Sequence, residues 1–196
     1  MSLKKIVIFA SGSGSSAENI IINFQKNKEI SIQKVYCNNK NAFVLERIKK
    51  YNINSLVFTN DDLLGKIVLN DLKNIQPDLI VLAGFLKKIP SKIINDFKNK
   101  IVNIHPSLLP NHGGKGMFGL NVHKKVIDSN DAHTGFTIHF VNEKYDEGGI
   151  IFQKKIKVNT DRPKDLAASV LKEEHKYYPK IIINLLNGNT RDNNIY

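Results

Sequence analysis

The segment that most limits the possible folds is an uninterrupted apolar run, Leu79-Ile80-Val81-Leu82-Ala83-Gly84. It shows no alternation of apolar and polar side chains, so neither face of the strand that it predicts is suited to water. Such a strand belongs in the middle of a sheet that helices cover on both faces. Because strand-like and helix-like segments alternate along the chain, we predict an α/β fold with a mostly parallel, twisted sheet.

The periodicity of apolar residues also predicts where the elements lie. Expected strands cover residues 5–9, 30–37, 55–58, 79–84, 101–105, 136–141 and 150–158, and expected helices cover 17–26, 41–51, 61–75, 91–97, 120–128 and 165–186. Ser91 is the expected N-cap of its helix, and Gly188 is expected to stop the last one. Without a repeat, a linker or a second zone of composition, we expect one domain over residues 1–196, with a polar tail (187–196) that frays.

The composition bounds the class of protein. A chain of 196 residues is long enough for a core. No apolar run approaches the ~20 residues of a membrane helix, and no signal peptide is recognisable. Cys37 is the only cysteine, which excludes an internal disulfide and fits a reducing compartment. We therefore expect a cytoplasmic protein that does not contact a membrane.

The net charge of +11 raises the question of a nucleic-acid partner. The lysines, however, are scattered along the whole chain, and neither an RNP-like aromatic motif nor a Cys/His zinc spacing is present. A solvated basic surface is therefore favoured over nucleic-acid binding. Attraction of small polyanionic substrates is a third interpretation.

A polar pair stands out at the end of a predicted strand, in Ile101-Val102-Asn103-Ile104-His105-Pro106-Ser107-Leu108-Leu109-Pro110. Asn103 and His105 are two apart, so in a strand they point the same way. Pro106 stops a central strand, which leaves His105 at its carboxyl end, where open α/β sheets bind ligands. An amide donor beside an imidazole suits acyl-group chemistry, whereas the alternative is a buried polar pair that serves structure.

The loop Gly12-Ser13-Gly14-Ser15-Ser16 follows the first strand and precedes the first helix. Glycines, serine hydroxyls and a helix N-terminus can bind a phosphate, although a simple turn and cap is the alternative. A dinucleotide is not expected, because the second strand ends in Cys37-Asn38-Asn39 without the acidic ribose partner. The loop also lacks the Gly-Lys-Ser/Thr of a Walker motif.

Other polar residues are ambiguous when taken alone. Asp146 lies in a turn before Gly148 and Gly149, and His139 shares a strand face with Thr137, so both turn or core roles and functional roles are open. His112 lies in a glycine-rich loop where it could bind a ligand. Because the remaining histidines have no mutual metal spacing, we expect no metal site.

Several of these segments occur together in one family. The chain resembles the phosphoribosylglycinamide formyltransferases (glycinamide ribonucleotide transformylases), which depend on folate. The resemblance rests on FASGSGSS from Phe9, PDLIVLAGF from Pro77, VNIHPSLLP from Val102, HFV from His139, YDEGG from Tyr145, and Glu174-His175 with Tyr178-Pro179. These segments run in family order over nearly the whole chain. The resemblance implies a Rossmann-like formyltransferase fold and formyl transfer from 10-formyltetrahydrofolate to 5-phosphoribosylglycinamide in de novo purine biosynthesis.

The resemblance also implies roles for residues. Asn103, His105 and Asp146 would be catalytic, with Asp146 keeping His105 charged or oriented, and His139 and Thr137 would support them. The ribonucleotide would be held by Gly14, Ser15, Ser16 and Glu174. The folate would contact Leu86, Lys87, Lys88 and Ile89, then Asn103, and then Asn142, Glu143, Lys144, Tyr145 and Asp146. The expected partners are these small molecules, without nucleic acid or metal, and the protein would be a monomer or homodimer.

Two departures from the family pattern stand out. Many members carry a basic substrate or cofactor contact where this chain has Asn60-Asp61-Asp62-Leu63-Leu64, and the loop 111–119 is longer and richer in glycine. We expect altered loop contacts but the same reaction. The competing interpretations are methionyl-tRNA formyltransferase and formyltetrahydrofolate deformylase, whose additional domains this chain has no room for, and a non-catalytic RNA-binding α/β domain.

Overall fold

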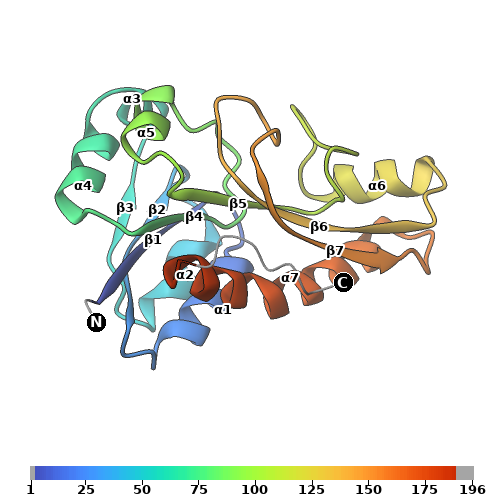
Figure 1. Cartoon of the computed structure of the whole chain (residues 1–196), viewed down its shortest axis with the longest axis horizontal. Coiled ribbons are helices and arrows are strands. Elements are labelled where there is room, and N and C mark those ends of the chain that lie inside the picture. Colours follow the sequence, from blue (N-terminus) through green and yellow to red (C-terminus); the bar gives the residue numbers. More distant parts are fainter. Residues whose placement is uncertain (1–2, 189–196) are drawn as a thin grey trace. The chain divides into compact units, whose positions relative to one another are not determined.

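The computed structural model describes residues 3–188, so residues 189–196 of the tail that we expected to fray lie outside the described residues. The chain forms two compact units, Met1–Val102 and Asn103–Tyr196, which are described one at a time (Figure 1). The hydrogen-bonded strands follow the order β3-β2-β1-β4-β5-β6-β7. The predicted α/β class with a mostly parallel sheet is confirmed.

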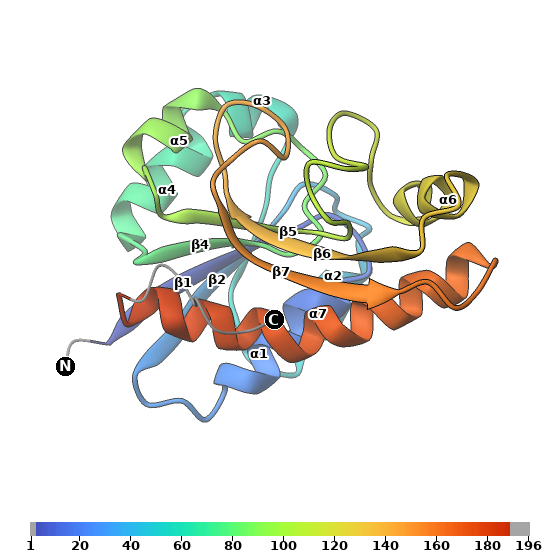
Figure 2. The same cartoon turned by 45° about the vertical axis from the view of Figure 1, so that its right-hand side comes forward.

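The first unit is a parallel sheet between two layers of helices. Strand β1 (Lys4–Ala10) pairs with β2 (Ile30–Cys37) and with β4 (Leu79–Leu82), and β2 pairs with β3 (Ser55–Val57). One face carries α1 (Ser15–Phe24) and α2 (Phe43–Lys49), and the other carries α3 (Asn60–Leu64), α4 (Ile67–Ile75) and α5 (Ser91–Asp96), as Figure 2 shows. All four residues of β4 are buried, as its apolar run predicts.

The second unit combines a hairpin with a long helix. Strand β6 (His133–Phe140) pairs antiparallel with β7 (Ile150–Lys157). Helix α7 (Pro163–Leu186) packs against β6 and against α6 (Leu120–Asp128). Strand β5 (Ile101–His105) starts at the end of the first unit and carries Asn103 and His105 into the second.

Two predictions of local structure were wrong. The helix expected over 61–75 is two helices, because α3 ends at Gly65 and α4 begins only at Ile67. The first of them also starts earlier than expected, at a capping box between Thr59 and Asp62. Gly65 has φ −81° and ψ −139°, which no α-helix continues through. Ser91 is the first residue of α5 rather than its N-cap; the cap is Pro90, whose backbone is extended and whose side chain offers no acceptor.

Aromatic packing fixes the carboxyl ends of β1 and β2 in the first unit. The rings of Phe9 and Tyr36 stack with centroids 4.5 Å apart, and Phe85 meets Phe9 edge to face at 5.2 Å. Such pairs stabilise the packing by more than the burial of their apolar area alone. The polar loop that follows β1 therefore starts from a fixed position. Within residues 3–188, no helix has the length and apolar character to cross a membrane.

Candidate active site

Strand β5 delivers Asn103 and His105 and then stops. His105 is 4% exposed, and a turn follows in which Ser107 N donates to the carbonyl oxygen of His105 at 2.9 Å. Thr137 of β6 holds this turn: its hydroxyl donates to Ser107 O at 2.7 Å and accepts from Leu109 N at 3.0 Å. Two satisfied hydrogen bonds on a buried hydroxyl keep the segment after His105 in one place.

Asp146 reaches the same place from the connection between β6 and β7. Its φ is +56°, a left-handed conformation that Asp tolerates better than most residues. The chain then turns back so closely that a Cβ on Gly148 would lie 1.7 Å from Phe140 O, so only glycine fits there. The glycine at position 148 thus has a steric cause, because it lets the connection turn back directly after Asp146.

The carboxylate of Asp146 lies between two imidazoles. Its Oδ2 is 3.6 Å from Nδ1 of His105 and its Oδ1 is 3.7 Å from Nε2 of His139, and Gly114 N donates to Oδ2 at 2.8 Å. The Asp146 side chain is 12% exposed, and both imidazoles are nearly buried. A carboxylate so placed can accept a proton or hold a charged imidazole opposite it.

His139 fixes the orientation of the Asn103 amide. Nδ1 of His139 lies 2.9 Å from Phe140 O, so Nδ1 carries a proton, and burial lowers the pKa of His139, which keeps the ring neutral. Its Nε2 therefore accepts from Nδ2 of Asn103, 3.2 Å away. Among residues 3–188, no described partner takes the second N–H of that amide. Asn103 thus has a free donor beside the Asp146 carboxylate.

His105 is oriented by a backbone carbonyl. Its Nε2 lies 2.9 Å from the carbonyl oxygen of His112, which can only accept, so Nε2 carries a proton and Nδ1 faces Asp146. A third histidine, His123, lies nearby on α6. Burial, together with the charge on His105, lowers the pKa of His123 to about 4, so that ring is neutral at pH 7.

In the first unit, the loop 12–16 is held by α2. Gly14 has φ +76° and is the N-cap of α1, and a Cβ there would lie 2.4 Å from Cγ2 of Val44. Nε of Arg47 donates to Ser13 O at 2.8 Å, and Arg47 also pairs with the Glu18 carboxylate. Hydrogen bonds from Lys50, Arg47 and Tyr51 lower the pKa of Glu18. The loop therefore has the left-handed glycine and rigid backbone of an anion-binding turn.

The other predicted binding residues are placed as follows. Leu86, Lys87 and Lys88 are exposed, whereas the Ile89 side chain is buried and can contribute only its backbone to a surface. Leu86 N donates to the Ser11 hydroxyl at 2.9 Å, which fixes the start of this segment. Four further predicted residues are exposed in the turn before Asp146, namely Asn142, Glu143, Lys144 and Tyr145.

Glu174 lies on α7, 7% exposed, and burial raises its pKa to about 7. No contact between Glu174 and the Asn103, His105 and Asp146 side chains is described within residues 103–188. The structure thus brings the predicted catalytic residues together with His139, whereas Thr137 acts on the turn behind His105. All the roles assigned to these residues remain predictions.

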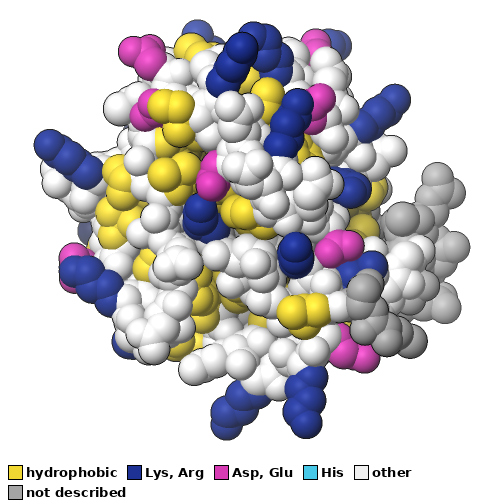
Figure 3. Space-filling model, turned by 90° about the vertical axis from the view of Figure 1, so that its left-hand side faces the viewer, with side chains coloured by type: hydrophobic (Ala, Val, Ile, Leu, Met, Phe, Trp, Pro, Cys, Tyr) yellow, Lys and Arg dark blue, Asp and Glu magenta, His cyan; other side chains and the backbone are white. Residues whose placement is uncertain are grey.

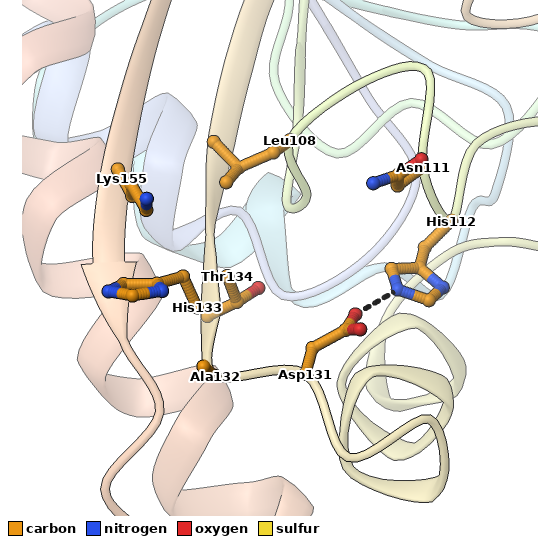
Figure 4. A pocket seen from close by; sticks show the side chains of 8 residues that line it. All are labelled: Leu108, Asn111, His112, Asp131, Ala132, His133, Thr134 and Lys155. Carbon is orange, nitrogen blue, oxygen red and sulfur yellow. Dashed lines mark hydrogen bonds and ion pairs between the residues drawn. The ribbon is translucent and has the colours of Figure 1, made fainter.

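Sequence reasoning singled out the loop 111–119 but did not anticipate the contacts that its backbone makes. The carbonyl of His112 and the N–H of Gly114 contact the site through the backbone, and backbone groups leave no mark in the sequence. The His112 side chain pairs with Asp131 at 2.6 Å, beside a cavity of about 250 Å3 (Figure 4). The cavity is lined by Leu108, Asn111, His112, Asp131, Ala132, His133, Thr134 and Lys155. Over the described part of the chain, no three His, Cys, Asp or Glu side chains are grouped to hold a metal ion.

The fold and this cluster are those of an α/β group transferase that handles an acyl group, with N–H donors beside a proton-accepting carboxylate. The chain belongs to the formyl transferase family, whose model matches residues 4–182.

Several similar proteins within this family share one name. The phosphoribosylglycinamide formyltransferase of Bacillus subtilis is 33% identical over 196 residues, covering 96% of this chain and 98% of that protein. The chloroplastic phosphoribosylglycinamide formyltransferase of Arabidopsis thaliana is 38% identical over 189 residues, or 91% of this chain. This chain spans 64% of the length of the Arabidopsis protein and 60% of its Vigna unguiculata counterpart.

Solved structures agree with these sequence relatives. The phosphoribosylglycinamide formyltransferase from Brucella melitensis is 33% identical with a TM-score of 0.84, covering 94% of this chain and 96% of that one. The enzyme from Anaplasma phagocytophilum is 31% identical with a TM-score of 0.86, covering 95% of this chain and 89% of that one. The resemblance stated from the sequence motifs is thereby confirmed.

Proposed function

We propose that the chain transfers a formyl group from 10-formyltetrahydrofolate to the amine of 5-phosphoribosylglycinamide, as a step of de novo purine biosynthesis. The observation that supports it most is the Asp146 carboxylate set between His105 and His139, with the Asn103 amide oriented beside it. The names of the relatives give the acceptor and the formyl group that is transferred. The folate donor is part of the proposal and rests on the family resemblance, and the site supplies chemistry that fits it.

The reaction follows from what these groups can do. The acceptor amine attacks the formyl carbon, so a new C–N bond forms while negative charge grows on the formyl oxygen. The N–H of Asn103 and the Nδ1–H of a protonated His105 would stabilise that oxygen; losing one such donor typically costs ~3 kcal/mol. The C–N bond to the folate nitrogen then breaks, and Asp146, directly or through a water, would carry the proton from the amine to that nitrogen.

The first unit would bind the phosphate. Gly14, Ser15 and Ser16 stand at the start of α1, where N–H groups and hydroxyls favour an anion. We assign Glu174 to the glycinamide end, and the exposed segments 86–88 and 142–145 to the folate, with Ile89 contributing only its backbone. We also place the enzyme in the cytoplasm, because Cys37 is buried as a free thiol.

The basic charge does not require a nucleic-acid partner. On the face shown in Figure 3, lysine and arginine side chains stand apart among other residues and do not gather into one basic patch. Scattered cations of this kind suit solubility and attraction of small polyanions better than binding to a phosphate backbone.

A turnover assay tests the proposal. Purified protein is mixed with 10-formyltetrahydrofolate, and release of tetrahydrofolate is followed with and without phosphoribosylglycinamide. Release only with the ribonucleotide supports formyl transfer. Release without it would instead indicate a hydrolase, and no release in either mixture would contradict the proposal.

A further inference from the structure

The loop 111–119 contacts both charged residues of the site through its backbone. His112 O lies 2.9 Å from Nε2 of His105, and Gly114 N lies 2.8 Å from Oδ2 of Asp146. The first contact requires a proton on Nε2, because a carbonyl oxygen cannot donate. It therefore makes Nδ1, which faces Asp146, the His105 nitrogen whose protonation can change.

Residue 112 is not held there by its own backbone preference. His112 has φ +54°, in the left-handed region, where His occurs more often than most residues but which still costs a residue with a side chain free energy. A side-chain contact that can hold it there is the hydrogen-bonded pair with Asp131, in which Nε2 of His112 lies 2.6 Å from Oδ2. Asp131 lies just before β6, so this pair ties the loop to the sheet (Figure 4).

The His112–Asp131 side-chain pair is not part of the cluster of Asn103, His105, His139 and Asp146. The His112 side chain is 14% exposed and the Asp131 side chain 35% exposed. Both line the 250 Å3 cavity, together with exposed His133 on the same wall as Lys155. The described contacts between His112 and His105 pass through the His112 carbonyl, so any effect of this side chain on the reaction is indirect.

We propose that His112 and Asp131 are positioning residues for the transfer reaction, because their hydrogen-bonded pair sets the loop whose carbonyl and N–H orient His105 and Asp146. The inference rests on the proposed function. Without the pair, residue 112 relaxes, the His105 ring loses its fixed orientation, and Asp146 loses a hydrogen bond.

Three variants test the pair. Asp131→Asn removes the charge, His112→Asn removes the imidazole while tolerating a positive φ, and His133→Ala is the control, because His133 lines the same cavity without a described contact to the site. We expect kcat to fall about tenfold in the first two variants while KM for either substrate changes less than about twofold. The double variant should be no worse than the poorer single one, because both break the same contact.

The pH profile of kcat separates positioning from simple stability. Among residues 3–188, the titratable groups described near His105 are Asp146, His139 and His123; Asp131 pairs with His112, and His133 and Lys155 line the same cavity. Loss of the pair should change the shape of this profile, which a purely structural role would not alter, and Asp131→Glu should restore part of kcat. His133→Ala should leave kcat, KM and the profile within about twofold of the parent protein.

Two outcomes would overturn the inference. One is an unchanged kcat and pH profile in Asp131→Asn and His112→Asn while His105→Ala is inactive. If these two variants have a lower melting temperature but an unchanged kcat, the pair is only structural, and the inference is overturned as well. The other comes from nitrogen NMR of the His105 ring, which does not depend on turnover. A proton shared equally between Nε2 and Nδ1 in the parent protein removes the geometric basis. If the parent protein transfers no formyl group, the proposed function fails, and this NMR measurement still decides the orientation of His105.

Discussion

Nδ2 of Asn103 lies 3.2 Å from Nε2 of His139, so a neutral imidazole decides which way the amide points. The other ring nitrogen of His139 donates to Phe140 O at 2.9 Å, which leaves no rotational choice for the ring. A donor intended for a developing oxyanion must be oriented before the reaction starts. The strand that supplies Asn103 and the strand that supplies His139 thus act together in preparing one N–H group.

This relationship predicts that His139→Leu lowers kcat although His139 itself transfers no proton. The amide of Asn103 would lose its acceptor and turn, and a misdirected donor costs about 10–100-fold in rate. Steady-state kinetics with saturating substrates measure the effect. His133→Leu is the control, because it makes the same change at an exposed position of the same strand. An effect as small as that of the control would mean that the amide is oriented by something else.

Asp146→Asn is predicted to lower kcat by roughly 10²–10⁴-fold with little change in KM, since it removes the carboxylate that handles the proton. Asn tolerates the φ of +56° as Asp does, so the turn should persist and the melting temperature should stay near that of the parent protein. Glu147→Gln, at the next and exposed position, is the matched control. If both variants keep near-normal kcat, Asp146 has a structural role only.

The positions of these residues were predictable to different degrees. Residues within one strand, such as Asn103 and His105, follow from the two-residue period, and β2 and α6 have the bounds that their patterns predicted. The meeting of Asp146 with β5 depends on the hairpin of β6 and β7, which a local pattern does not contain. The association of Asp146 with Asn103 and His105 was therefore predicted from the family motifs and not from the spacing of the residues.

The missed features have physical reasons as well. Thr59 and Asp62 carry a capping signature that marks the start of α3, and Gly65 carries a stop signal that would have divided the helix expected over 61–75. The contacts made by His112 O and Gly114 N belong to the backbone, so residue type does not announce them. The acid that holds His112 is Asp131, nineteen residues away, and only the tertiary structure pairs them.

His123 predicts a loss of stability in acid. Burial, with the charge on His105, lowers its pKa from 6.5 to about 4, so between these values the unfolded chain binds a proton that the folded chain does not. Its contribution to stability is complete above pH 6.5 and is lost as the pH falls toward 4, by roughly 3 kcal/mol in all. Urea unfolding of His123→Leu and of the control His133→Leu, each across this range, measures it. Only His123→Leu should reduce the fall in unfolding free energy on the acid side. Equal slopes of unfolding free energy against pH in the two variants would contradict the assignment.

Glu174 predicts the opposite dependence. Burial raises its pKa from 4.5 to about 7, so the folded chain keeps a proton that the unfolded chain releases. The stability linked to this group is complete below pH 4.5 and is lost as the pH rises through 7, by roughly 3 kcal/mol. The difference in unfolding free energy between Glu174→Gln and the parent protein should therefore shift in favour of the variant as the pH rises from 5 to 8. Glu173→Gln, beside it and partly exposed, should show no such change, and a parallel response of the two variants would refute the prediction.

Gly14 and Gly12 offer a matched test of the loop that we assign to the phosphate. Gly14 has φ +76°, and a Cβ there would lie 2.4 Å from a methyl carbon of Val44 and 2.7 Å from its Cα, so Gly14→Ala must strain or move the start of α1. A Cβ on Gly12 meets nothing within 4 Å, so Gly12→Ala leaves the loop in place.

We expect Gly14→Ala to cost about 1–3 kcal/mol of unfolding free energy and to raise KM for the ribonucleotide several-fold, while KM for the folate stays close to its parent value. Val44→Ala in the same chain should recover only part of the stability, because the backbone contact and the positive φ remain. Thermal unfolding and steady-state kinetics on the four chains measure both effects. A destabilised Gly14→Ala protein with an unaltered KM for the ribonucleotide would place the phosphate elsewhere, because a displaced helix start cannot bind the same anion equally well.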